Sequence, residues 1–275
     1  MSHELHLHKI GPINDCRLTL DSFTILAGPQ ANGKSTAAKA VYFFRSVKQD
    51  ILSIMMQGGP NAVPGDKAST WNTVLKQRMK DKFLQLFGTS WAMPSDMRME
   101  YQYSEDVSIT VSLEDNYNDS SKNYIVIDFS KSIENYLEAL SLHIFTNITP
   151  AQKEYEEKKL NELFDDPFEP VFIPAGRNLL TLLSTQLNYI FTSLEDSQLR
   201  NIDYVTKRYT ELILRLKPVF AHGMEGIANR MKDDPTQSKK YERICPALNV
   251  LMDQAKEIMQ STYRYVDGEE RLYLS

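Results

Sequence analysis

The alternation of apolar and polar residues predicts several strands in this chain. Residues 4–10 and 16–20 alternate with period two, and the turn-rich segment 11–15 between them predicts an antiparallel hairpin. Residues 97–115 and 123–130 alternate in the same way, so we expect both segments in an antiparallel sheet. Two further runs predict short strands: 22–28 is mainly apolar and β-favouring, and 171–173 is continuously apolar, as in a buried strand.

Apolar residues at helical spacing predict most of the remaining elements. The first helix is expected over 34–57, where Gly58, Gly59 and Pro60 end it. Further helices are expected over 67–87, 133–143, 150–164, 204–220 and 240–260, and a closing hairpin over 263–275 turns at Asp267 and Gly268. After the run 171–173, a sharp turn at 174–177 precedes Asn178, which can cap another helix. We divide the chain into segments 1–60, 61–168 and 169–275.

The most specific motif lies between the apolar run 22–28 and the first helix. The stretch "AGPQANGKST" fits the phosphate-loop pattern G-x-x-x-x-G-K-[S/T] in full, with an apolar run before it and a helix after it. Glycines permit backbone angles that turn successive N–H groups inward, which creates a concave site for anions. The candidate nucleotide-binding residues are Gly28, Pro29, Gln30, Ala31, Asn32, Gly33, Lys34, Ser35 and Thr36.

Each polar residue of this motif has a predicted role. Lys34 can reach the β- and γ-phosphates, and the Ser35 hydroxyl can bind the Mg²⁺ ion that accompanies them. Thr36 and the start of the helix place positive partial charge beneath the α-phosphate. No guanine-specific [N/T]-K-x-D segment is recognised in the sequence, which favours ATP as the nucleotide.

Composition and charge limit the class of protein. The chain has 275 residues, of which 42% are hydrophobic, and these values suit a globular core. Its net charge of −5 does not imply nucleic-acid binding, although a local basic patch stays possible. Cys16 and Cys245 lie far apart and outside metal-type spacing, which suits a reducing cytoplasm. We expect a cytoplasmic protein, because neither a membrane span nor a signal peptide is recognised.

The order of these parts resembles a known plan. Together with "GPQANGKST" and "FIPAGR", it is similar to the N-terminal part of ABC-type ATPases of the SMC/RecF kind. Within these it looks most like the bacterial AAA-family proteins grouped with OLD-type nucleases and phage-defence ATPases. The resemblance implies an α/β P-loop NTPase fold, namely an ABC-ATPase-like head with an antiparallel β-subdomain and a helical region.

The resemblance also implies parts that are not recognised in this sequence. An ABC-type head needs an LSSGQ-like signature segment, an apolar strand ending in Asp-Glu and a switch histidine. We therefore expect a partial head without its C-terminal half, with little ATP hydrolysis by this chain alone. A homodimer, or a partner that supplies the missing half, would complete the site. The alternative is a non-enzymatic, nucleotide-gated scaffold or interaction protein.

Two further residues are candidates for the nucleotide site. The segment "YIVIDFS" has the outline of a Walker B strand ending at Asp128, but Phe129 occupies the place of the catalytic glutamate. We interpret it as a strand of the antiparallel subdomain. Arg177 either contacts phosphate or a partner subunit, or is a surface arginine beside a helix cap, and the sequence leaves both open.

Two other groups of residues have a structural interpretation. His3, His6 and His8 are interpreted as histidines on the solvent side of a strand rather than metal ligands, because no Cys or carboxylate cluster is near in the sequence. A basic run within the predicted helix 67–87 is interpreted as a solvated face rather than a nucleic-acid site. This run consists of Lys76, Arg78, Lys80 and Lys82.

Overall fold

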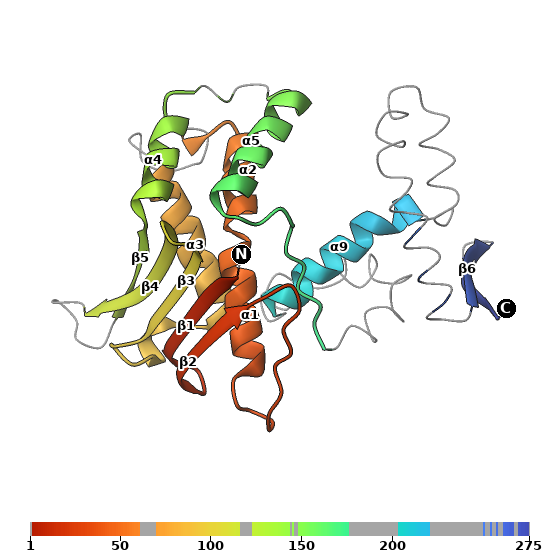
Figure 1. Ribbon diagram of the computed structural model, residues 1–275, viewed down its shortest axis with the longest axis horizontal. Coiled ribbons are helices and arrows are strands. Elements are labelled where there is room, and N and C mark those ends of the chain that lie inside the picture. Colours follow the sequence, from red (N-terminus) through yellow and green to blue (C-terminus); the bar gives the residue numbers. More distant parts are fainter. Residues whose placement is uncertain are drawn as a thin grey trace, which may run out of the picture. The chain divides into compact units, whose positions relative to one another are not determined.

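The computed structural model describes residues 2–60, 70–115, 123–143, 145, 148–175, 203–220, 250, 254, 257, 261–266 and 269–274. The chain divides into two compact units, Met1–Phe172 and Ile173–Ser275, which are described separately (Figure 1). The second unit contains α9 (Tyr204–Phe220) and an antiparallel hairpin of β6 (Ser261–Val266) and β7 (Glu269–Leu274). This hairpin confirms the predicted closing strands. Its predicted turn at Asp267 and Gly268 lies outside the described residues, as do the predicted helix after Asn178 and most of 240–260.

The first unit is built on a five-stranded antiparallel sheet with strand order β2-β1-β3-β4-β5. Its strands are β1 (His3–Ile10), β2 (Ile13–Leu20), β3 (Arg98–Ser104), β4 (Val107–Asp115) and β5 (Asn123–Phe129). Because β1 pairs with both β2 and β3, the N-terminal hairpin and the later strands belong to one sheet. The predicted segments 1–60 and 61–168 therefore share a single core.

Two predicted strand boundaries differ in the structure. Ile10 pairs with Ile13, so the first hairpin turns at Gly11 and Pro12, and Asn14 and Asp15 belong to β2 rather than to the turn. Gly11 has a φ of +55°, which allows so short a connection. The alternating segment 97–115 is a hairpin rather than one strand, because the polar pair at 105–106 separates β3 from β4.

The helices of the first unit pack on the sheet and on one another (Figure 1). They are α1 (Lys34–Arg45), α2 (Val47–Met56), α3 (Trp71–Phe87), the short 3-10 helix η2 (Ser90–Ala92), α4 (Lys131–Leu140) and α5 (Pro150–Leu163). Alternate residues of the central strands point into the core, as Leu5, Leu7 and Tyr101 show by their near-zero exposure. The ring of Phe44 on α1 stacks on Tyr101 at 5.3 Å.

The predicted helix 34–57 is divided in two at Ser46. The Ser46 hydroxyl donates to the carbonyl of Phe43 at 2.9 Å and accepts from Nζ of Lys82 at 2.8 Å. Serine that bonds back to the preceding turn commonly bends a helix. The next helix begins at Trp71, because the Thr70 hydroxyl accepts from the N–H of Thr73 and caps the helix, and the expected start at 67–69 lies outside the described residues.

Neither of the two predicted apolar strands forms a strand. Residues 22–28 and 171–173 pair with no strand among the described residues, and several of their apolar side chains are exposed. The exposed fraction is 80% for Phe23, 74% for Ile25 and 54% for Val171. A strand needs a neighbour for its backbone hydrogen bonds as well as an apolar sequence, and the described sheet offers none here.

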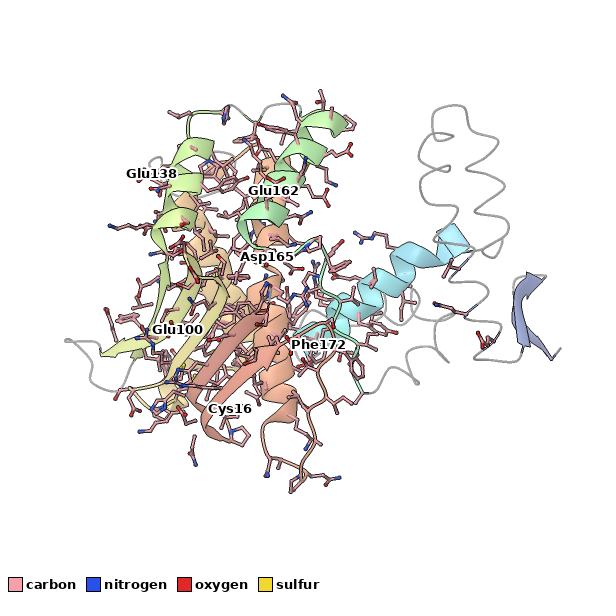
Figure 2. The ribbon with its side chains drawn as sticks, in the orientation of Figure 1. Cys16, Glu100, Glu138, Glu162, Asp165 and Phe172 are labelled. Carbon is pink, nitrogen blue, oxygen red and sulfur yellow. The ribbon has the colours of Figure 1, made fainter. Side chains whose placement is uncertain are left out.

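Buried ion pairs join the helices of the first unit. Lys82 on α3 pairs with Asp50 on α2, and both side chains are almost completely buried. Lys48 on α2 donates to the side chain of Asn161 and to the backbone carbonyl of Asp166, just beyond α5. The chain then runs past Asp165 to Phe172 (Figure 2), whose ring contacts Tyr42 on α1 at 5.9 Å between centroids. The segment that leads to "FIPAGR" is thus held against α1 and α2.

Candidate phosphate-binding site

The predicted phosphate loop lies between the segment 22–27, which has no regular secondary structure, and the first residue of α1. Three of its residues have positive φ, namely Gly28 at 150°, Ala31 at 62° and Gly33 at 83°. Left-handed residues interspersed in a loop turn neighbouring N–H groups toward one side, which is the geometry of an anion-binding nest. Ala31 is notable, because a residue with a Cβ rarely adopts this conformation. The backbone thus has the type of conformation that the motif predicts.

Gly33 is fixed by its contact with the N-terminal hairpin. A Cβ at this position would lie 2.4 Å from Cγ1 of Ile13, the first residue of β2. The left-handed φ and the close approach of Ile13 both favour glycine here. The hairpin turn also lies near the start of α1, since a Cβ on Gly11 would lie 3.6 Å from the hydroxyl of Thr36. The first hairpin therefore packs against the end of the loop and the first turn of α1.

The side chain of Lys34 folds back across the loop. Its Nζ donates to the carbonyl of Gly28 at 2.7 Å and also to the carbonyl of Pro29. The ammonium group therefore lies at the first glycine while its backbone begins α1. A phosphate oxygen could take the place of either carbonyl as the acceptor of these hydrogen bonds. The ammonium group of Lys34 is therefore available to an anion in the loop.

The start of α1 adds positive potential to this loop. Its first turn contains no acidic residue, and Gly33 provides no side-chain cap for the free N–H groups. Unpaired N–H groups and the helix dipole favour a negative ligand. Ser35 is exposed and Thr36 is half-buried, so the hydroxyl of Ser35 can be reached from solvent.

The structure brings all nine predicted residues from Gly28 to Thr36 into one loop and the first helical turn. Among the described residues, no hydrogen bond or ion pair joins a carboxylate to the loop. The described part of the chain also contains no group of three or more metal-ligating side chains. Arg177, the tenth predicted residue, lies outside the described residues, so its role stays a prediction.

Asp128 lies far from the loop. It belongs to β5 and pairs with Thr110 on β4, as the antiparallel interpretation predicts. The phosphate loop follows β2, which is the opposite edge of the sheet from β5. Four strand spacings separate the two edges, or about 19 Å. A role for Asp128 at the Mg²⁺ ion of this loop is therefore inconsistent with the described sheet.

The three N-terminal histidines do not share one face of the sheet. His3 is buried, contrary to the prediction, and its ring contacts the Tyr101 hydroxyl at 2.9 Å and the Asp165 carbonyl at 3.3 Å. It faces the core because its odd position matches that of Leu5 and Leu7 on β1.

His6 and His8 lie on the solvent side, as predicted. Both approach Oδ1 of Asp15 on β2, at 2.9 Å for His6 and 3.1 Å for His8. These hydrogen bonds, the one from His6 first, lower the pKa of the Asp15 carboxyl. The sequence did not indicate this carboxylate, because the pairing of β1 with β2 brings it across the hairpin.

The basic run on α3 does not form one solvated face. Lys82 is buried against Asp50, and Arg78 donates to the side chain of Gln57 at 2.9 Å. Lys76 lies on another side of the helix, with its Nζ 5.4 Å from the centroid of the Phe129 ring. The prediction was wrong because alternating lysines are distributed around a helix, where some meet acidic partners on neighbouring helices.

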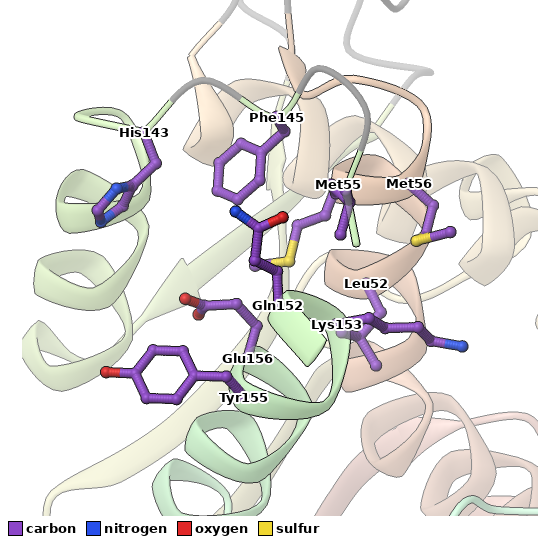
Figure 3. Close-up of a pocket in the computed structure, with 10 residues that line it drawn as sticks. Leu52, Met55, Met56, His143, Phe145, Gln152, Lys153, Tyr155 and Glu156 are labelled. Atoms are coloured by element: carbon purple, nitrogen blue, oxygen red, sulfur yellow. The ribbon is translucent and has the colours of Figure 1, made fainter. Parts of the chain in front are cut away.

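A cavity of about 130 Å³ lies between α2 and α5. Figure 3 shows Met55 of α2 and Phe145 on one side of it, and Gln152 and Glu156 of α5 on the other. From Lys34 to Met55 the two helices span about 30 Å, so this cavity is separate from the phosphate loop. The Tyr136 hydroxyl donates to Glu156 at 3.0 Å, so this carboxylate already has a partner.

Sequence reasoning missed the ionic contacts that hold α1. Arg45, Lys48 and Asp166 form a mostly buried cluster at the end of this helix. Asp166 is 121 residues away from Arg45 in the chain, and no local pattern connects them. An isolated basic residue on the apolar face of a helix is the one signal that could have suggested Lys48.

Comparisons with known proteins give no family for this chain. A scan against protein-family models, a search of curated proteins and a search of solved structures each returned no match. In the described residues, no helix has both the length and the apolar character needed to cross a bilayer.

Proposed function

We propose that this chain binds ATP with Mg²⁺ at the loop from Gly28 to Thr36. The observation that carries the proposal is the position of Lys34, whose ammonium group folds over a loop with left-handed residues at Ala31 and Gly33. The full sequence motif and this backbone conformation support the same assignment. Backbone N–H groups of the loop surround the phosphates, Lys34 contacts the β- and γ-phosphates, and Ser35 enters the shell of the Mg²⁺ ion.

The wider role that we propose rests on the resemblance in sequence. The stretches "GPQANGKST" and "FIPAGR" support an ABC-type ATPase head of the SMC/RecF kind, from a DNA-related or phage-defence ATPase. Such a head completes its catalytic site with groups from a second copy or from another partner. With Asp128 at the far edge of the sheet, no catalytic acid is assigned in this chain. We therefore expect slow turnover by the chain on its own.

A second candidate is a nucleotide-gated scaffold, and the segment before the loop favours it. Phe23 and Ile25 are exposed and apolar, and they lie within ten residues of Gly33 on the same stretch of backbone. A partner strand that covered them would order the chain that enters the phosphate loop. Binding of nucleotide and binding of partner would then favour each other. Steady-state ATPase activity, measured with and without such a partner, separates the scaffold from the enzyme.

Equilibrium titration with a fluorescent ATP analogue tests the proposed site. We expect saturable binding that requires Mg²⁺, that unlabelled ATP competes away, and that Lys34→Ala weakens by at least about tenfold. Lys39→Ala is the matched control, because Lys39 lies on α1 five residues further along and outside the loop. Equal binding by the wild type and Lys34→Ala would contradict the assignment.

A further inference from the structure

The outer edge of β2 is open in the part of the chain that the structure describes. Figure 1 shows β2 at the margin of the sheet, and its one described strand neighbour is β1. Every residue from Asn14 to Leu20 is exposed or half-exposed, whereas Ile125 and Ile127 at the opposite edge are buried. An exposed edge strand offers backbone N–H and C=O groups to another strand. The described sheet can therefore be extended at β2.

Two opposite charges flank Cys16 on this strand (Figure 2). Asp15 and Arg17 are both exposed, and residues two apart on a strand share one face of the sheet. His6 and His8 both bond to Oδ1 of Asp15, so its Oδ2 has no partner among the described residues. Arg17 likewise has no carboxylate partner in the described ranges. The edge thus carries an unpaired cation beside a carboxylate with one free oxygen.

We propose that β2 pairs with β2 of a second copy of this chain, antiparallel, with the two-fold axis at Cys16. Asp15 of each copy then lies opposite Arg17 of the other. The paired segment runs from Ile13 to Thr19, which is all of β2 except its last residue. Because the order Asp-Cys-Arg becomes Arg-Cys-Asp in the antiparallel copy, the strand is complementary to itself in charge. The two sheets become one continuous sheet, and the interface requires no nucleotide.

Charge favours this register over its neighbours. Opposite residues of an antiparallel pair direct their backbone groups alike, so the two-fold axis must pass through a residue. An axis at Asp15 or at Arg17 would place two like charges opposite each other, and an axis at Leu18 would place Asp15 opposite Asp21 of the second copy. Like charges directly opposite each other destabilise a strand pair, whereas opposite charges stabilise it. Among the middle residues of β2, the axis at Cys16 therefore gives the favoured pairing.

The other face of β2 also supports an added strand. Cys16 and Leu18 pair with Leu7 and Leu5 of β1, which are buried, so all four side chains lie on the core side of the sheet. Cys16 and Leu18 nevertheless stay half-exposed, as expected for residues at an edge with no described strand beyond it. A second copy of β2 covers the outer flank of these side chains in both chains. Burial of this apolar surface stabilises the pairing.

Disulfide trapping tests the register. In a background with Cys245→Ser, we expect mild oxidation to link two chains through Cys16, because residues directly opposite in an antiparallel pair lie about 4.5–5.5 Å apart between Cα atoms. The control is Thr19→Cys combined with Cys16→Ser. Thr19 is more exposed than Cys16, but in this register its two copies lie about 20 Å apart. Random collisions would favour the control, so equal or faster trapping of the control, or trapping of neither, would overturn the proposed pairing.

Charge reversal tests the same interface without a disulfide. Arg17→Asp gives a chain with two aspartates beside Cys16, and Asp15→Arg gives a chain with two arginines there. Neither variant is complementary to itself, so we expect each dimer dissociation constant to exceed that of the wild type by about tenfold or more. A mixture of the two variants should form a heterodimer, because each arginine then lies opposite an aspartate. Sedimentation equilibrium of the full chains measures these constants.

The double variant, Asp15→Arg with Arg17→Asp, is the matched control. It exchanges the two charges but keeps the strand complementary to itself, so its dissociation constant should lie within about threefold of the wild-type value. A wild type that is monomeric at all concentrations would contradict the proposal. So would a mixture of the single variants that associates no more tightly than either variant alone.

Discussion

Arg45 and Asp166 form a bidentate ion pair at the C-terminal end of α1. Nε of Arg45 lies 2.8 Å from Oδ2 of Asp166, and Nη2 lies 2.6 Å from Oδ1. The Asp166 side chain is 1% exposed. Burial opposes its ionisation, but the hydrogen bonds from Arg45 and the charge of Lys48 outweigh burial and hold its pKa below the usual value. The pair fixes the chain beyond α5 against α1.

Removal of one member of this pair should destabilise the first unit. We expect Asp166→Ala to lower the free energy of unfolding by about 3 kcal/mol, because it leaves Arg45 and buried Lys48 without their carboxylate. Glu162→Ala is the control, since Glu162 pairs with Lys158 on the exposed surface of α5. That change should cost less than about 0.5 kcal/mol. Urea unfolding followed by circular dichroism measures the free energy of unfolding of both variants. Similar losses would show that the buried pair stabilises the first unit no more than a surface pair does.

Gly33 should tolerate alanine poorly, and part of the cost should depend on Ile13. Gly33 is left-handed, with φ 83° and ψ 5°, and a Cβ there would lie 2.4 Å from Cγ1 of Ile13. The left-handed backbone alone costs alanine about 1 kcal/mol. Gly33→Ala adds the clash with Ile13, and we expect about 1–3 kcal/mol more.

Urea unfolding measures the cost of Gly33→Ala in the wild type and in an Ile13→Ala background. The smaller side chain at position 13 should recover part of the clash energy, so Gly33→Ala should cost less in that background. Equal losses in the two backgrounds would show that Ile13 moves aside without cost.

Local patterns predicted the elements whose stability is local. Phosphate binding stays a prediction, but the backbone of two turns could be predicted from the sequence. Gly11 and Pro12 separate two alternating runs, and Gly28 and Gly33 permit the positive φ values of the loop before α1. Both depend on backbone conformation within a few residues.

Features that need a distant partner could not be predicted in this way. Residues 22–28 have a strand-like sequence but no neighbouring strand among the described residues. Lys82 is read as a surface lysine in the sequence, and it is buried because Asp50 on another helix faces it. The polar face of a helix cannot show which of its charges will meet a partner in the folded chain.

His3 should make stability depend on pH below its ordinary pKa. Burial lowers the pKa of His3 in the folded chain, so between that value and about 6.5 the unfolded chain binds the additional proton. The contribution of neutral His3 is complete above pH 6.5 and is lost as the pH falls toward the folded pKa. We expect His3→Phe to lose less stability than the wild type between pH 7.5 and 5.

The same measurement separates His3 from the carboxylates. The free energy of unfolding is measured for wild type and His3→Phe at both pH values. Groups such as Asp15 and Asp166 contribute equally to both proteins, so the difference between the two proteins reports on His3 alone. An identical pH dependence would mean that His3 is not buried in its neutral form.

The chain alone should hydrolyse ATP slowly. The loop and Lys34 bind the ground state and the transition state with similar geometry, and such uniform binding contributes little to turnover. Loss of one well-placed electrostatic group typically lowers the rate by about a hundred- to a thousandfold. A monomer that turns over about one ATP per second, with activity abolished by Lys34→Ala, would contradict this prediction. It would require a catalytic acid that has not been assigned in this chain.

The most direct test of the phosphate site is amide NMR of the ¹⁵N-labelled chain. Titration with ATP and Mg²⁺ should shift the amide signals of Gly33, Lys34, Ser35 and Thr36, because their N–H groups would bond to phosphate oxygens. Adenosine, which lacks phosphates, should leave them unchanged, and the amide of Gly88 should not move with either compound. Unshifted loop amides at saturating ATP, or equal shifts with adenosine, would contradict the account.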